Sequence, residues 1–168
     1  MDAAARPSKA SFAPEVSPDA RLLILGSLPG EVSLAKAQYY AHPQNQFWLL
    51  IGAVIGADLT ALAYPDRLAA LKSARIALWD VVRTAERRGS LDAAIRGHQP
   101  NPLADLAASL PELRAVGFNG ATSWKLGAPL LADDARLTLV PLPSSSPAYT
   151  IGFERKLTAW NALRMFLS

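Results

Sequence analysis

One short segment combines aromatic rings, amides and an imidazole, a mixture that could hold a nucleobase and also orient a water molecule. It covers residues 38–48 and reads QYYAHPQNQFW. Aromatic rings offer a surface on which a base can stack, and a side-chain amide can bond either a base edge or a water. The plainer alternative is that Asn45 caps a helix beginning near Phe47, with Phe47 and Trp48 in the core.

Two further segments have compositions that suit close contact with a ligand. Residues 26–30 read GSLPG, so their backbone N–H groups could approach a ligand, although the spacing of Walker and dinucleotide-binding loops is missing. Residues 142–149 read LPSSSPAY, which places small hydroxyl side chains between prolines in a stiff loop suited to phosphate. Either segment could equally be an ordinary turn, so neither is specific by itself.

A sheet must position these segments, because strand-like and helix-like stretches alternate along the chain. Apolar runs typical of buried strands cover residues 21–26, 75–82, 113–118 and 136–141. Helical patterns cover residues 47–55, 66–71, 101–110, 121–131 and about 153–167. This order predicts an α/β fold, a three-layer α/β/α arrangement with a short central, mostly parallel sheet of about four strands. Ligands bind such sheets at the carboxyl ends of the strands, where the segments lie.

The composition predicts one domain over residues 1–168, with residues 1–20 as a candidate flexible segment. The 168 residues are 51% hydrophobic and 18% charged, which is enough for a core. Seventeen Lys and Arg against fourteen Asp and Glu give a formal net charge of +3, which permits a polyanionic partner. We expect a cytoplasmic protein with no membrane contact, because no secretory signal or long apolar run is present.

Cysteine is absent and histidine is rare, which limits the chemistry available to this chain. Without cysteine, the chain has no disulfides, Cys-ligated zinc, iron–sulfur clusters or thiol nucleophiles. Two histidines are too few for most His-based metal sites, so we expect neither a metal nor a cofactor.

Together the three segments resemble the uracil-DNA glycosylase superfamily, and within it the hypoxanthine-DNA (deoxyinosine) glycosylase branch. GSLPG stands where mismatch-specific relatives have a Gly-x-Asn-Pro-Gly loop, and LPSSSPA takes the place of the second superfamily motif. AHPQNQFW is the most specific part of a resemblance that spans about residues 21–148. It implies a monofunctional enzyme of base excision repair that hydrolyses the N-glycosidic bond of a deaminated base in DNA, with hypoxanthine favoured.

Two positions depart from the superfamily pattern and direct attention to a third. Leu28 has no polar group where many members carry the Asp or Asn that directs the hydrolytic water. Leu142 is apolar where others have the His or Asn that stabilises the leaving base. In the hypoxanthine branch the catalytic asparagine matches Asn45, which we expect to orient the water through its carbonyl oxygen. His42 is the second catalytic candidate, since an imidazole can polarise a water or a phosphate.

The resemblance also implies which residues contact the base and the DNA. Tyr40 falls where the superfamily stacks a ring on the extruded base, and Leu28 belongs to the same base pocket. Asp80 and Asn119 are candidates to bind the base edge, although a structural role for Asp80 and a turn role for Asn119 stay open. The expected DNA contacts are Gly26, Ser27, Pro29, Gly30, Ser33, Ser144, Ser145 and Ser146.

The expected partner is double-stranded or single-stranded DNA that contains a damaged base, bound by a monomer in association with the nucleoid. Arg83, Arg87 and Arg88 either contact phosphates or form a solvated surface. No lysine in the motifs suggests a Schiff base, so we expect hydrolysis without strand cleavage. The alternatives are a mismatch-specific uracil or thymine glycosylase, a non-catalytic nucleic-acid-binding module on this fold, and, remotely, a serine hydrolase, which would lack its G-x-S-x-G elbow.

Overall fold

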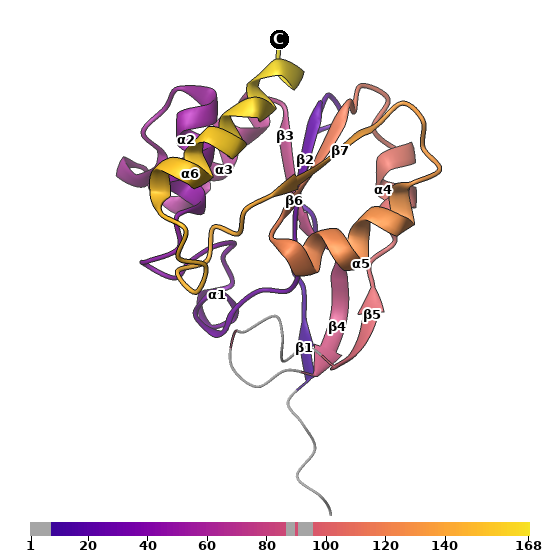
Figure 1. The fold of residues 1–168 in the computed structure, drawn as a ribbon, viewed down its shortest axis with the longest axis horizontal. Coiled ribbons are helices and arrows are strands. Elements are labelled where there is room, and N and C mark those ends of the chain that lie inside the picture. The colour runs from indigo at the N-terminus through magenta and orange to yellow at the C-terminus, as the bar shows by residue number, and fades with distance from the viewer. Residues whose placement is uncertain (1–7, 87–89, 91–95) are drawn as a thin grey trace, which may run out of the picture.

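A four-stranded parallel sheet forms the centre of the computed structural model, which describes residues 8–86, 90 and 96–168 (Figure 1). Its strands run in the order β3-β2-β6-β7, with bounds β2 (Leu22–Gly26), β3 (Ile76–Asp80), β6 (Ala115–Asn119) and β7 (Thr138–Leu142). Every residue of β2, β3 and β6 is buried, as expected when both faces of a parallel sheet are covered. The prediction of a short parallel sheet of about four strands is confirmed.

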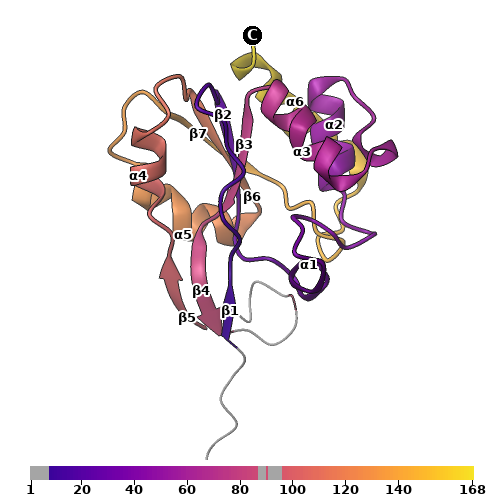
Figure 2. The ribbon, with the colours of Figure 1, turned by 180° about the vertical axis from the view of Figure 1, so that it is seen from behind.

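Helices cover both faces of this sheet and give the predicted three layers (Figures 1 and 2). One face carries α2 (Phe47–Ile55), α3 (Tyr64–Ser73) and α6 (Phe153–Asn161), and the other carries α4 (Leu103–Ala108) and α5 (Ala121–Leu131). Successive residues of β2 pack into different cores: Leu22 and Ile24 on the α2 side, Leu23 and Leu25 on the α5 side. Strand β2 therefore contacts both layers, and the loop that follows it starts from a buried strand end.

A second, antiparallel sheet was not predicted. Its strands β1 (Ser8–Ala10), β4 (Val82–Glu86) and β5 (Arg96–Pro100) pair in the order β1-β4-β5. The chain that carries Arg83 therefore continues from β3 as a strand, in which Val82 and Ala85 are buried and Arg83 is exposed. Arg87 and Arg88 lie outside the described residues.

Residues 8–20, which the sequence placed in a candidate flexible segment, pack against the domain. Strand β1 pairs with β4, and the carbonyl oxygen of Phe12 accepts a hydrogen bond from Trp79 Nε1 at 2.9 Å. The carbonyl oxygen of Ala13 accepts one from the Tyr39 hydroxyl at 2.8 Å. Residues 8–20 therefore make defined contacts with the domain, while residues 1–7 lie outside the described part.

Short helical pieces differ most from the predicted bounds. Helix α1 (Glu31–Lys36) was missed, because six residues are too few to show a helical period. The last helix ends at Asn161 and continues as a 3₁₀ helix (Ala162–Phe166), and another 3₁₀ turn covers Leu59–Ala61. Within the described ranges, no helix is long and apolar enough to span a membrane.

Candidate active site

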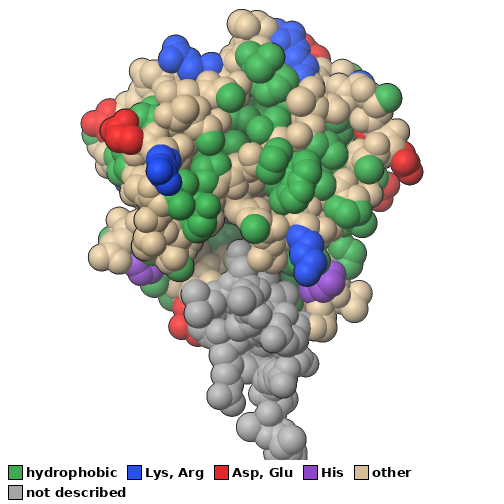
Figure 3. Space-filling view, viewed as in Figure 1, with side chains coloured by type: hydrophobic (Ala, Val, Ile, Leu, Met, Phe, Trp, Pro, Cys, Tyr) green, Lys and Arg blue, Asp and Glu red, His purple; other side chains and the backbone are tan. Residues whose placement is uncertain are grey.

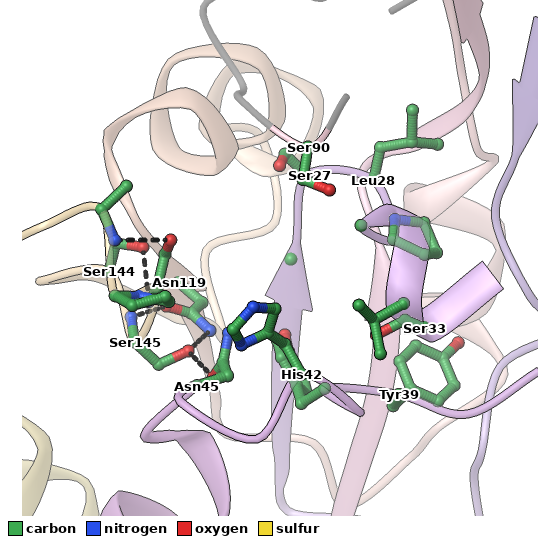
Figure 4. Close-up of a pocket in the computed structure, with 18 of the residues that line it drawn as sticks. Ser27, Leu28, Ser33, Tyr39, His42, Asn45, Ser90, Asn119, Ser144 and Ser145 are labelled. Carbon is green, nitrogen blue, oxygen red and sulfur yellow. Dashed lines mark hydrogen bonds between the residues drawn. The ribbon is translucent and has the colours of Figure 1, made fainter. Parts of the chain in front are cut away.

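The three segments singled out from the sequence meet around one cavity of about 470 Å³ (Figure 4). Pockets of roughly 300–1,000 Å³ hold small organic ligands, so a nucleobase would fit. All of the residues expected to contact base, water or DNA line this cavity, whatever role each has. The lining residues that sequence reasoning did not name are Val32, Tyr39, Ser90, Pro147, Ala148 and Tyr149. Tyr39 lies in the segment 38–48 and Tyr149 in the segment 142–149, so their place next to candidate site residues could have indicated them.

The last residues of β2 and β3 lie side by side at the cavity, because Gly26 and Asp80 are partners in the parallel pair. A Cβ atom on Gly26 would lie 2.6 Å from Asp80 Oδ1 and 2.9 Å from Tyr40 Oη, closer than real Cβ atoms come to other atoms. Glycine at position 26 is therefore what lets the carboxylate and the tyrosine share this edge of the sheet. Asp80 is only 3% exposed, so a ligand would meet its carboxylate in a largely dry environment.

Asn45 is held in the cavity wall by two hydrogen bonds to its carbonyl oxygen. Oδ1 accepts from the backbone N–H of Phe47 at 2.9 Å. It also accepts from Ser145 Oγ at 2.8 Å, as Figure 4 shows. The first bond satisfies the N–H of the first residue of α2, but the N-cap of this helix is Gln46, so Asn45 lies one residue before the capping position weighed from the sequence. A carbonyl oxygen has two lone pairs, and both are occupied. The expectation that this oxygen orients water is therefore not supported; Nδ2 is the atom left to act.

His42 shapes the turn that carries Asn45. Its Nδ1 accepts a hydrogen bond from the backbone N–H of Gln44 at 3.1 Å, and its carbonyl oxygen accepts one from Asn45 N at 2.9 Å. The imidazole is exposed and lines the cavity, so its Nε2 can still face a ligand. In the described part of the chain, no three His, Asp or Glu side chains gather closely enough to hold a metal ion.

The two consecutive tyrosines have different environments. Tyr40 lies parallel to Phe47, with ring centres 3.9 Å apart and planes 16° apart, so a ligand can stack only on the opposite face of Tyr40. Tyr39 is buried, and its hydroxyl donates to the carbonyl oxygen of Ala13. Burial raises the pKa of Tyr39, and the nearby Asp80 carboxylate raises that pKa further, so its phenol stays protonated.

In the serine loop, residues 142–149, the hydroxyls of Ser144 and Ser146 can face DNA, and that of Ser145 cannot. Ser144 Oγ accepts from the backbone N–H of Ser146 at 3.1 Å, and Ser146 Oγ accepts from that of Ala148 at 3.2 Å. Both hydroxyls keep their hydrogens, which could be donated to a phosphate. Ser145 is 1% exposed and donates its hydrogen to Asn45, so it differs from the expected DNA contact.

Asn119 is fixed by two hydrogen bonds to one partner. Its Oδ1 accepts from the backbone N–H of Ser145, and its Nδ2 donates to Ser145 Oγ, both at 2.9 Å. These bonds reach beyond the turn role weighed from the sequence, because they join the end of β6 to the loop that follows β7. Only one hydrogen and one lone pair of this amide remain for a base edge.

Leu28 and Ser33 support the cavity wall. Leu28 packs against Val82 and Ala85, so the position that lacks a polar group is filled by a small apolar cluster. Ser33 is buried, and its hydroxyl accepts from the backbone N–H of Ala41 at 2.9 Å. That bond ties α1 to the aromatic segment that carries Tyr40 and Asn45.

Lys156 is a buried lysine that holds the serine loop, and its burial predicts how the stability of the protein changes with pH. It is 1% exposed, its Nζ donates to the carbonyl oxygen of Ser146 at 3.1 Å, and burial lowers its pKa. The unfolded chain therefore keeps this proton to higher pH than the folded protein does, so stability should rise with pH between the two pKa values. Lys156→Met should lack that rise. Melting temperatures of both proteins from about pH 7 to about pH 11 check this, and parallel curves would contradict it.

Comparisons with known proteins agree on one family. The family model described as "Uracil DNA glycosylase superfamily" matches residues 13–164. A protein of Methanosarcina barkeri named "Hypoxanthine DNA glycosylase" is 40% identical over 152 residues, which are 90% of this chain and 95% of that one. A protein of the same name from Methanosarcina acetivorans is 39% identical over 155 residues, covering 92% and 97%. The solution NMR structure of a Methanosarcina acetivorans protein is similar at a TM-score of 0.86 and 38% identity, covering 96% and 99%.

Proposed function

This chain belongs to the uracil DNA glycosylase superfamily and is a DNA glycosylase, and from that premise we propose that its substrate is hypoxanthine in DNA. The observation that carries the proposal is the place of Asn45 in the wall of a cavity of nucleobase size that Tyr40 and the apolar Leu28 also line. The two curated relatives named hypoxanthine DNA glycosylases, each about 40% identical, support the same base.

The proposed reaction begins when the nucleotide is turned out of the DNA stack into the cavity. Extrusion costs a few kcal/mol, and a base stacked on Tyr40 recovers about 1–3 kcal/mol. The two are of similar size, so contacts of Ser144 and Ser146 with the flanking phosphates would tip the balance towards the extruded state. Asn45 would then act at the bond between sugar and base, and water would hydrolyse that bond.

An oligonucleotide assay tests the proposed substrate. Labelled duplexes that contain one deoxyinosine, deoxyuridine, deoxyxanthosine or G:T mismatch are incubated with the protein and then treated with alkali, which cuts at abasic sites. We expect the inosine strand to be cut fastest, an undamaged duplex to stay intact, and no cut before alkali. Faster release from G:U or G:T pairs would favour a mismatch glycosylase. Binding without any release would favour a non-catalytic module.

The choice of base should depend on Asp80, because a carboxylate that is ionised only accepts hydrogen bonds. It could accept the ring N–H of hypoxanthine or uracil, but it cannot donate to the adjacent carbonyl as an asparagine would. We therefore expect Asp80→Asn to shift the ratio of hypoxanthine to uracil release towards uracil. Single-turnover rates on the two duplexes measure that ratio, and an unchanged ratio would contradict a base-reading role for Asp80.

DNA binding is proposed to rely on local contacts more than on one large basic surface. In the view of Figure 3, Lys and Arg side chains are scattered over the face instead of forming a continuous stripe. The formal net charge of the chain is only +3. We therefore expect a monomer whose DNA affinity falls moderately with salt, by a slope of about one for each phosphate contact.

A further inference from the structure

We propose that Asn45 presents its amide nitrogen, a hydrogen-bond donor, to the departing base, and that Ser145 is the positioning residue that maintains this orientation. The inference rests on the proposed function, because it requires a base in the cavity. It specifies that Asn45 acts as a hydrogen-bond donor, and it gives a role to Ser145, whose hydroxyl is not proposed to contact DNA.

The orientation of the Asn45 amide follows from the nature of its partners. The backbone N–H of Phe47 lies 2.9 Å from the amide and can only donate, so the atom facing it must be the carbonyl oxygen. Ser145 Oγ lies 2.8 Å from the same oxygen. With both bonds made to Oδ1, the amide nitrogen must point away from these partners.

The direction of the Ser145 hydroxyl is set by Asn119. Asn119 Nδ2 donates to Ser145 Oγ at 2.9 Å, while its Oδ1 accepts from the backbone N–H of Ser145 at 2.9 Å. Because Oγ already accepts one bond, its hydrogen is directed towards Asn45. The backbone N–H of Gln46 also donates to the carbonyl oxygen of Ser145 at 2.9 Å. This bond and the one from Ser145 Oγ to Asn45 Oδ1 join the serine loop to the segment that carries Asn45. Ser145 and Asn119 are buried, so water competes little for these bonds.

A donor at this position suits the charge that develops during hydrolysis. When the glycosidic bond breaks, its electron pair leaves with the base, the water oxygen bonds to the anomeric carbon, and one water proton ends on the base. The departing hypoxanthine carries negative charge on its ring nitrogens and carbonyl oxygen, which accept hydrogen bonds. Among the described residues, none hydrogen-bonds to Asn45 Nδ2, so that atom is available to stabilise this charge.

Asn45→Asp distinguishes a donor from an acceptor. One carboxylate oxygen would take over the bonds from Phe47 and Ser145, and the other would face the cavity as an acceptor. We expect this variant to be as slow as Asn45→Ala near pH 8 and to recover in acid, as the protonated carboxyl becomes a donor. Each rate is compared with Asn45→Ala at the same pH, because acid alone promotes purine loss. Activity near pH 8 that declines in acid would overturn the donor assignment.

Ser145→Ala and Asn119→Asp test the positioning role. Ser145→Ala removes the hydroxyl that donates to Asn45. Asn119→Asp replaces the donor amide with an acceptor, so the Ser145 hydroxyl should donate to Asp at position 119 and no longer to Asn45. In each we expect single-turnover release to slow by about 10- to 100-fold while DNA affinity changes less than about twofold.

Ser123→Ala is the matched control, because it removes a buried serine hydroxyl that donates to Leu25 O, outside the cavity lining. It should keep the wild-type rate. A folded Ser145→Ala variant that also releases base at the wild-type rate would overturn the positioning role. Absence of release by the wild-type protein itself from every deaminated substrate would instead overturn the proposed function.

Discussion

Replacing Asn45 by alanine should reduce base release by about 100- to 1,000-fold, the loss typical of removing one preorganised donor from a site of developing negative charge. Ser144 and Ser146, which we propose contact phosphates, and the ring of Tyr40 would remain, so DNA affinity should change by less than about twofold. Single-turnover kinetics on an inosine duplex and a binding titration measure the two quantities separately. Full single-turnover activity of the variant would remove Asn45 from the mechanism.

The same substitution removes a bond at the start of α2, so stability has to be controlled. Loss of a helix-start acceptor costs about 0.5–2 kcal/mol, which lowers the melting temperature by a few degrees in a protein of this size. Asp134→Ala is the matched control, since Asp134 Oδ1 also accepts from a backbone N–H two residues on, that of Arg136, away from the cavity. Asp134 also pairs with the Arg136 guanidinium at 3.2 Å, so we expect Asp134→Ala to lose at least as much stability and to keep its activity.

Tyr40→Ala should also have a large effect, a fall in kcat/KM of about 5- to 150-fold. This corresponds to the roughly 1–3 kcal/mol that stacking a base on an aromatic ring provides. The variant also loses the parallel contact with Phe47, whose ring centre lies 3.9 Å away. Steady-state kinetics on the inosine duplex measure the change, together with a melting curve to confirm folding.

Tyr40→Phe separates the ring of this residue from its hydroxyl. It keeps the ring face that packs on Phe47 and the opposite face that is open to a base, so its kcat/KM should stay within about threefold of the wild-type value if stacking is the role of Tyr40. The backbone of Tyr40 has a φ of 53°, a strained left-handed conformation that Ala and Phe would share. A difference between the two variants therefore reports on the ring. Equal losses in both would assign the effect to the hydroxyl and contradict stacking.

The fold was predictable from the sequence wherever burial leaves a pattern in the residues. Strands such as Leu22–Gly26 and Ala115–Asn119 are apolar throughout, because helices cover both faces of the sheet. The antiparallel strands Val82–Glu86 and Arg96–Pro100 were not predicted, because their residues are largely polar. The contacts of residues 8–20 were not predicted either, since they depend on long-range bonds such as that from Trp79 to Phe12.

The sequence by itself determined the central sheet, the family, and the set of side chains that gather at the strand ends. Those features depend on residue type and order along the chain. Only the tertiary structure decided what each side chain can do there, because hydrogen-bond partners come from distant segments. Asn45 and Ser145 are one hundred residues apart, yet their bond at 2.8 Å occupies the amide oxygen and leaves the nitrogen to act. The hydrogen-bond partners of each lone pair come together only when the chain is folded, so no pattern in the sequence could have identified them.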